Sequence, residues 1–137
     1  MFSTYLRNAL LNWYTQSAAF PTAPATLYFS AHTADPTRTG TVAEVTTTIR
    51  PAGRPALAAT NWDAIATVAG ARETKTTAII DFGNSAGAVS GDLTHAAIWD
   101  AAGGGNCLEI QQLPAPIPVG LGTLIQVPIG LFKLNLP

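Results

Sequence analysis

Over most of the chain, apolar residues recur at every second position in short runs, and Gly and Pro residues separate those runs. In TLYFSAHT (26–33), Leu27 and Phe29 fall on one face of an extended chain and Tyr28 falls on the other. A period of two is typical of β-strands, because successive side chains of a strand point to opposite faces of the sheet. The pattern therefore predicts a protein built mainly from short strands.

Six further segments are expected to form strands: VAEVTTTIR (42–50), TKTTAIIDF (74–82), LTHAAIWD (93–100), CLEIQQL (107–113), TLIQVP (123–128) and LFKLNL (131–136). The stretch AIID (78–81) is expected to be buried on both faces. PALAATNWDAIATVAG (55–70) fits either a strand with a loop or a short turn of helix. AAGGGN (101–106) is expected to be a hairpin loop. The Pro-rich LPAPIPVGLG (113–122) is expected to be a rigid, extended loop.

One helix is expected near the N-terminus, over residues 3–19. Leu6, Leu10 and Trp13 are spaced by four and three residues, which places them on one face of a helix. The Ser-Thr pair at its start can cap the first turn. Because the apolar stripe is narrow, we expect the helix to pack against something larger, with Trp13 in the core.

These elements predict a mainly β protein, a small antiparallel β-sandwich (jelly-roll-like) or barrel with one N-terminal α-helix. The length of 137 residues suits a single domain (1–137), made of the helix (3–19) and a β-sandwich (24–137). A chain of this length can bury about two-thirds of the surface that it exposes when unfolded, so one hydrophobic core is possible. The strand order in residues 50–75 stays open.

The chain is poor in charge, with 11 % charged residues against about 25 % in typical domains. A large permanent contact with other protein would explain this, because interface cores are depleted in charge. A surface rich in threonine, of which there are 18, would explain it equally well. The net charge is −1 and no basic run exists, so nucleic-acid binding is not expected.

Residues 110–132 carry no charge, and that length could span a bilayer. Four prolines interrupt the segment, however, and lipid does not tolerate unsatisfied backbone groups, so no membrane association is expected. The N-terminus lacks the pattern of a signal peptide. Cys107 is the single cysteine, which excludes an internal disulfide and favours a small buried apolar role.

The stretch GNSAG (83–87) fits the G-x-S-x-G pattern of the nucleophilic serine of α/β-hydrolases. That fold needs a large sheet and a helix directly after the serine, whereas this chain is short and continues with Gly and Ser residues. We therefore interpret GNSAG, including Ser85, as a loop. No enzymatic activity, catalytic residue or cofactor is expected.

Two histidines, His32 and His95, are the candidate metal ligands, and neither has a partner residue at metal-ligand spacing. A site would have to form across strands, with a carboxylate such as Glu44, Asp81 or Asp100. A half-buried histidine that is hydrogen-bonded to a neighbour is the commoner arrangement. No metal is therefore expected.

Aromatic and proline residues supply the candidate contacts. Trp99 alternates with core-type residues and is expected to be buried, whereas Trp62 is the tryptophan to test for surface contact. A Pro-rich arm loses little conformational freedom when it docks. The candidate contact residues are Trp62, Pro114, Pro116, Ile117 and Pro118. Trp62 and Tyr28 are the alternative candidates for a row of aromatics that stacks on sugars.

Four stretches resemble a known family: YLRNALLNW (5–13), PATLYFSAHTADPT (24–37), a Glu-Val pair (44–45) and DLTHAAIWDAAGGGNCL (92–108). They are similar to small tailed-phage virion proteins that are commonly labelled "tail fibre" proteins. Members carry an L-R-N-x-L-L helix, a T-A-D-P-T turn and a T-H-x-[GA]-[IL]-[FW]-D-A-A-x-G-G-N-x-L segment. The resemblance covers most of the chain and departs most in residues 50–75.

The resemblance implies a non-enzymatic structural protein of a tailed-phage virion, made in the bacterial host cytoplasm. A capsid cement or decoration protein is the favoured interpretation, because a charge-poor surface suits a protein that lies flat across the shell. A tail fibre, tail or baseplate subunit is the alternative, and a carbohydrate-binding β-sandwich at the host surface is a weaker one. The expected partners are copies of itself, with a trimer favoured, and the major capsid protein or other virion proteins.

Overall fold

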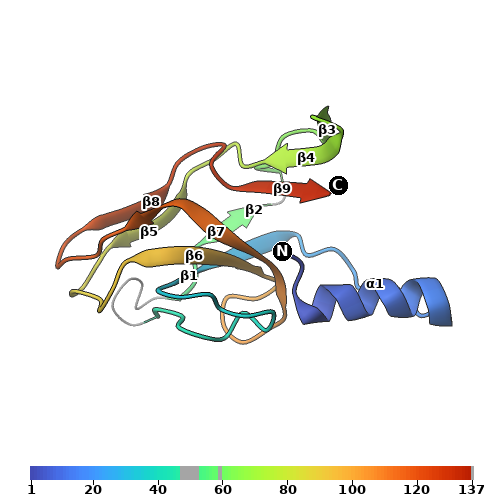
Figure 1. The fold of residues 1–137 in the computed structure, drawn as a ribbon, viewed down its shortest axis with the longest axis horizontal. Helices are drawn as coiled ribbons and strands as arrows, with labels where there is room; N and C mark the ends of the chain where they lie inside the picture. The colour runs from blue at the N-terminus through green and yellow to red at the C-terminus, as the bar shows by residue number, and fades with distance from the viewer. Residues whose placement is uncertain (47–52, 59, 137) are drawn as a thin grey trace.

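The computed structural model describes residues 1–46, 53–58 and 60–136, in which one helix precedes nine strands (Figure 1). The elements are α1 (Thr4–Gln16), β1 (Thr26–His32), β2 (Ala56–Ala58), β3 (Ala66–Val68), β4 (Ala71–Lys75), β5 (Ile80–Asn84), β6 (Leu93–Trp99), β7 (Cys107–Ile117), β8 (Leu124–Val127) and β9 (Lys133–Leu136). The predicted mainly β fold with one N-terminal helix is confirmed.

The strands form three antiparallel sheets, with the orders β2-β1-β6-β7, β3-β4-β9 and β5-β8. The β5–β8 ribbon lies over the four-stranded sheet, and the core fills the space between them (Figure 1). This arrangement is a small sandwich. The described strands do not close into a barrel, so the barrel alternative is wrong.

The main core joins both layers and the C-terminal segment. Phe29 of β1 and Ile98 of β6 are 0 % and 1 % exposed, and they belong to one cluster with Phe82 of β5. Phe132 lies edge-on to Phe29, with ring centroids 5.4 Å apart. Such pairs add about 0.5–1.5 kcal/mol beyond burial alone. The strand alternation predicted for residues 26–33 therefore orients the core correctly.

The opposite face of the four-stranded sheet is covered as well. Trp99 and Cys107 are 3 % and 4 % exposed and form a second, smaller cluster with Ala97 and Ile110. The predicted burial of Trp99 is thus confirmed. The N-terminal segment and the chain after β1 cover this second face. The C-terminal halves of β1 and β6 are therefore buried on both faces.

Two strand predictions fail in the middle of the chain. In residues 42–46 the pairing is limited to one antiparallel bridge between Glu44 and His32, because a turn at residues 42–43 precedes it; residues 47–50 lie outside the described part. The segment 74–82 is divided between β4 and β5 by a bend. Its two halves therefore join different sheets.

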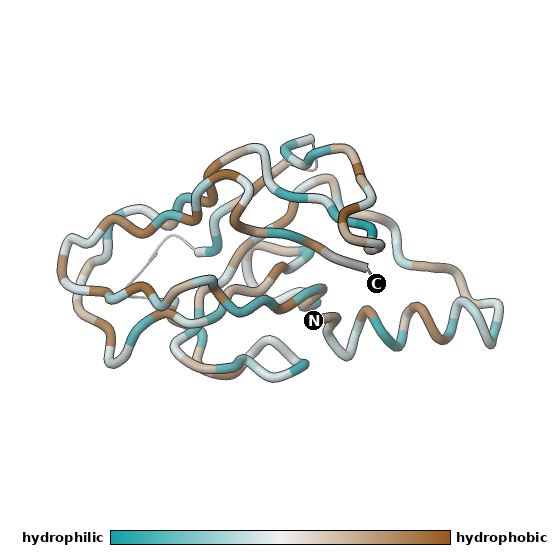
Figure 2. The backbone as a smooth tube through the Cα atoms, turned by 45° about the horizontal axis from the view of Figure 1, so that its top comes forward, coloured by the Kyte–Doolittle hydropathy of each residue, from teal (hydrophilic) through white to brown (hydrophobic). Residues whose placement is uncertain are grey.

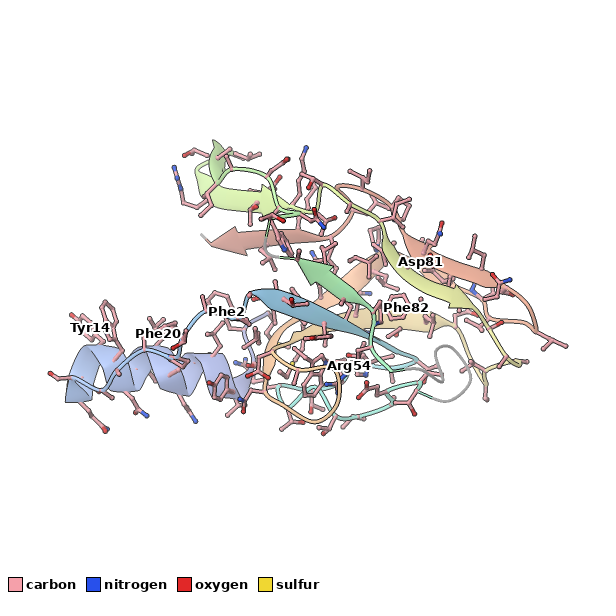
Figure 3. The ribbon with its side chains drawn as sticks, turned by 180° about the vertical axis from the view of Figure 1, so that it is seen from behind. Phe2, Tyr14, Phe20, Arg54, Asp81 and Phe82 are labelled. Carbon is pink, nitrogen blue, oxygen red and sulfur yellow. The ribbon has the colours of Figure 1, made fainter. Side chains whose placement is uncertain are left out.

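The prediction that AIID (78–81) is buried on both faces is also wrong. Ile79 is 48 % exposed and Ile80 is 2 % exposed, and Asp81 is exposed again. Figure 3 shows Phe82 directed inward and Asp81 outward. The β5–β8 ribbon therefore has one solvent-exposed face, as is usual for antiparallel strands.

The Pro-rich segment 113–122 is not wholly a loop, because β7 continues to Ile117. Proline lacks the N–H that a central strand needs, but β7 is the edge strand of its sheet and tolerates Pro114 and Pro116. The register to β6 shifts between Leu93 and His95, where this stretch begins. The ambiguous segment 55–70 forms β2 and β3, which confirms its reading as strand and loop.

Two features limit strand addition at the outer edge of β7, the pairing of residues 1–3 with its first half and the prolines near its end. Residues 1–3 pair with its first half, through bonds of 2.9 Å from the Ile110 N–H to the Met1 carbonyl and 3.1 Å from the Ser3 N–H to the Leu108 carbonyl. The Gln111 side-chain amide donates to the Lys133 carbonyl at 2.9 Å and accepts from the Lys133 N–H at 3.3 Å, and so ties β7 to the start of β9. The prolines follow.

Candidate functional site

The largest departure from the sequence prediction is α1. It spans Thr4–Gln16, shorter than the predicted 3–19, because Ser17 adopts the left-handed conformation (φ 53°) that ends a helix. None of its residues is buried, and Trp13 is 53 % exposed. The prediction that Trp13 lies in the core is therefore wrong. The helix projects from the sheets instead (Figure 1).

The first turn of α1 nevertheless anchors the helix to the β part. Ser3 is fully buried; its hydroxyl donates to the Cys107 carbonyl and accepts from the Leu6 N–H at 3.1 Å. The Thr4 N–H donates to the Arg38 carbonyl at 2.9 Å. One serine thus caps the helix and joins it to β7, so the direction of α1 is fixed at its base.

Beyond this base, the helix carries a continuous apolar surface. We define the α1 stripe as Leu6, Leu10, Trp13 and Tyr14 with the following Phe20. Trp13 and Phe20 meet edge-to-face, with centroids 6.4 Å apart, and Tyr14 is 81 % exposed. Figure 3 shows Tyr14 and Phe20 on the same side of the helix, and Figure 2 shows apolar segments along it, away from the sheets. Trp13, Tyr14 and Phe20 line a shallow hollow with residues 17–19.

The predicted contact residues fall into two separate places. Pro114, Pro116 and Pro118 are exposed along and just after the end of β7, whereas Ile117 is half-buried against the main core. Trp62 is also half-buried and lies edge-on to Phe132, with centroids 6.4 Å apart. Its indole N–H is buried and has no hydrogen-bond partner. Their role as contacts stays a prediction.

The two aromatics considered for sugar stacking do not lie in one row. Tyr28 packs against the small cluster around Trp99, and Trp62 packs against the main core. These clusters cover different faces of the four-stranded sheet. The most exposed aromatic side chains near one another are those of the α1 stripe.

A polar cluster, which the sequence did not reveal, is centred on Arg54, which is half-buried. Its guanidinium pairs with Glu44 through two bonds of 2.9 and 3.0 Å and lies 3.6 Å from the centroid of the Trp99 ring. It also donates to the carbonyls of Ala101 at 3.3 Å and Gly104 at 2.8 Å. A planar guanidinium can pair, stack and donate at once. Arg54 therefore joins the loop after β1 to the β6–β7 loop.

A chain of hydrogen bonds continues inward from Trp99. The indole N–H donates to Ser30 Oγ at 2.7 Å, and Ser30 Oγ lies 2.7 Å from His32 Nε2. His32 Nδ1 lies 2.8 Å from the Val42 carbonyl. These partners fit a neutral imidazole that carries its proton on Nδ1. Burial lowers the pKa of His32, against the opposing effects of the Val42 carbonyl and the Glu44 carboxylate.

His32 and His95 are cross-strand neighbours on β1 and β6, but both ring nitrogens of His32 are occupied by protein groups. Within the described ranges, no group of three or more His, Cys, Asp or Glu side chains could hold a metal ion. Asp100 instead accepts two bonds from Asn106, at 2.7 and 2.8 Å, and so closes the predicted hairpin loop.

The loop interpretation of GNSAG (83–87) is confirmed from Ser85 on and is wrong for Gly83 and Asn84, which end β5; Ser85 itself has a structural role. Its side chain is 3 % exposed, donates to the Gly120 carbonyl and accepts from the Thr123 N–H at 3.0 Å. These bonds fasten the chain after β5 to the turn before β8. Cys107 is buried, and burial raises the pKa of its thiol to about 12, so the reactive thiolate is suppressed.

In a comparison with known protein families, one family model matches the chain. The family described as Gp80, podophage GP4 fiber I protein gp80, matches residues 1–135. No curated protein matches the chain. In the part of the chain that the structure describes, no helix is long and apolar enough to cross a membrane.

Proposed function

The chain belongs to the podophage fiber I protein family, and on that premise we propose that it is a non-enzymatic structural subunit of a tail fibre. The match over residues 1–135 carries the proposal, because it includes both the sheets and the projecting helix. The name of this family fits the tail-fibre alternative better than the capsid cement role that the sequence analysis favoured. Cement and decoration are therefore not the function proposed.

The surface chemistry supports a role in assembly. A fibre subunit needs contacts with other protein chains, and such contacts favour aromatic side chains and little charge. The chain has few charges, and its exposed large apolar residues include Tyr14 at 81 % and Leu121 at 78 %. Exposed apolar patches of this kind commonly mark protein–protein contact sites.

The side chains that could suggest an active site have structural partners instead. Ser85 fastens two turns, His32 lies within a closed chain of hydrogen bonds, and the Cys107 thiol is buried. These observations favour a protein that acts through its surface. The proposed partners are copies of itself, with a trimer favoured, and other virion proteins, without nucleic acid or a membrane.

Copy number in purified particles tests the proposal. Quantitative mass spectrometry against the major shell protein is expected to give a small multiple of three or six per particle. A ratio near one, or a simple fraction of one, would support the cement role and contradict a tail position. Absence from the particle would overturn any structural role in the virion.

A further inference from the structure

We propose that the α1 stripe is the surface through which copies of this chain associate, each stripe packing against the stripe of another copy. This inference deepens the proposed fibre function, because it names the partner and the contact surface of the subunit. It rests on the exposure of the helix, its chemistry and the way its base is fixed.

The exposed area is the first argument. Trp13, Tyr14 and Phe20 are 53 %, 81 % and 46 % exposed, and Leu10 is 45 % exposed. With about 150–250 Å² per fully exposed aromatic side chain, these residues present roughly 400 Å² of apolar surface. A stable interface buries about 800 Å² per partner, of which somewhat more than half is apolar. The α1 stripe thus supplies most of the apolar area that one side of a stable dimer needs.

The length of the helix is the second argument. Isolated helices of fewer than about 12–15 residues are marginal in water, and most helices gain stability from packing an apolar face. Helix α1 has 13 residues, none of them buried. Ser3 fixes only its first turn. Packing against another protein surface would stabilise the remaining turns.

The charge pattern identifies the partner. Arg7 is the single charged residue between Thr4 and Gln16, and the face opposite the stripe carries neutral residues such as Asn8 and Asn12. Helices that lie on membranes carry Lys and Arg on the polar face, so a lipid surface fits poorly. The five stripe residues carry no charge, and Arg7, seven residues before Tyr14, is the one charge at the margin of the stripe, so two copies can face each other with little repulsion. The spacing of Leu6, Leu10 and Trp13 also matches the apolar seam of helix–helix packing.

The position of the helix allows such a contact. Its base is bonded to β7 and to the Arg38 carbonyl, and its remaining length extends beyond the sheets (Figure 1). The stripe is therefore held in one orientation rather than on a free tail, and it loses little freedom when a second copy binds.

The test compares two matched changes of exposed apolar residues. The double variant Leu10→Gln with Trp13→Gln removes the centre of the α1 stripe, and Leu121→Gln removes an exposed leucine in the turn before β8, outside the stripe. Sedimentation velocity of the full chain over a range of concentrations measures self-association. We expect the wild type to associate and the double variant to dissociate at least about tenfold more readily, whereas Leu121→Gln behaves as the wild type.

Several outcomes would overturn the inference. A wild-type chain that stays monomeric at micromolar concentration, a double variant with wild-type association, or an equal loss in Leu121→Gln would each contradict it. Near-ultraviolet circular dichroism, which reports the buried Trp99, controls for folding, and a Tyr14→Gln variant repeats the test if the double variant does not fold. A monomer present at tail copy number would overturn this inference alone; an oligomer absent from the particle would overturn the fibre role alone.

Discussion

The side chains of Trp13 and Tyr14 on helix α1 are 53 % and 81 % exposed. In contrast, the cluster centred on Arg54 holds the polar side chains of Arg54, Glu44 and His32 largely away from solvent. Apolar side chains stand in solvent in the first region, and charged side chains are enclosed in the second. In both regions, the residue type alone would predict the wrong degree of burial. What differs is whether the partner is present: Arg54 has five polar or aromatic contacts within the chain, and the α1 stripe has few.

The contrast separates two sources of order. The Arg54 cluster contributes to the folding of the chain itself, since its bonds connect segments 47 and 50 positions apart. The α1 stripe contributes little to folding and is available for association. Variants in the two regions should therefore affect different measurements.

The largest expected effect tests the buried side of this contrast. Arg54→Met should lower the free energy of unfolding by about 3–5 kcal/mol, because it leaves the Glu44 carboxylate without its partner in a poorly solvated place. Urea unfolding followed by circular dichroism measures the loss. The double variant with Glu44→Gln should recover part of it. A loss below about 1 kcal/mol in Arg54→Met would show that the cluster contributes no more than a surface ion pair.

Acid should weaken the same region. Because burial lowers the pKa of His32, the unfolded chain binds a proton that the folded chain resists, so stability falls as the pH drops below about 6.5. The slope contributed by one histidine is at most about 1.4 kcal/mol per pH unit. Thermal unfolding at a series of pH values measures it. A His32→Gln variant should lose this part of the slope, and an unchanged slope would contradict the assignment.

A change at the base of α1, where the helix joins the β part, should have a smaller effect on the free energy of unfolding. Ser3→Ala removes the N-cap and the hydroxyl bond to the Cys107 carbonyl, and it should cost about 1–2 kcal/mol. Hydrogen exchange should quicken in α1 more than in β1 and β6. Equal quickening throughout would mean that Ser3 supports the whole fold rather than the helix base.

The smallest effect is expected on the exposed side. Trp13→Gln should change the unfolding free energy of the dilute, monomeric chain by less than about 0.5 kcal/mol, because surface substitutions rarely do more. Urea unfolding at low protein concentration measures this. A loss of several kcal/mol would mean that Trp13 supports the fold of the chain, and the contrast between the two regions would fail.

The sequence pattern correctly predicted those elements that depend on neighbouring residues alone. Alternation located β1 and β6, and Asp100 before a run of glycines located the hairpin loop. The bend at residues 76–79 and the extension of β7 through Pro114 depend on which sheet each segment joins. That information lies in distant parts of the chain.

The candidate sites show the same limit. Spacing correctly identified the apolar face of α1 at Leu10 and Trp13, but it carries no information on which surface covers that face. Arg54 had no local signal, since its partners lie at positions 44, 99, 101 and 104. Ser85 was interpreted correctly because a helix is required directly after a nucleophilic serine, and its absence is visible in the sequence.

The edge of β7 bears on how far an assembly of this protein can grow. An open strand edge accepts further strands without limit, which leads to sheets of undefined size. On the β7 edge, the first residues occupy backbone groups of Leu108 and Ile110, and Pro114 and Pro116 have no N–H to donate. Strand addition at the β7 edge is thereby suppressed, which favours association through side-chain surfaces, and such contacts can close after a fixed number of copies.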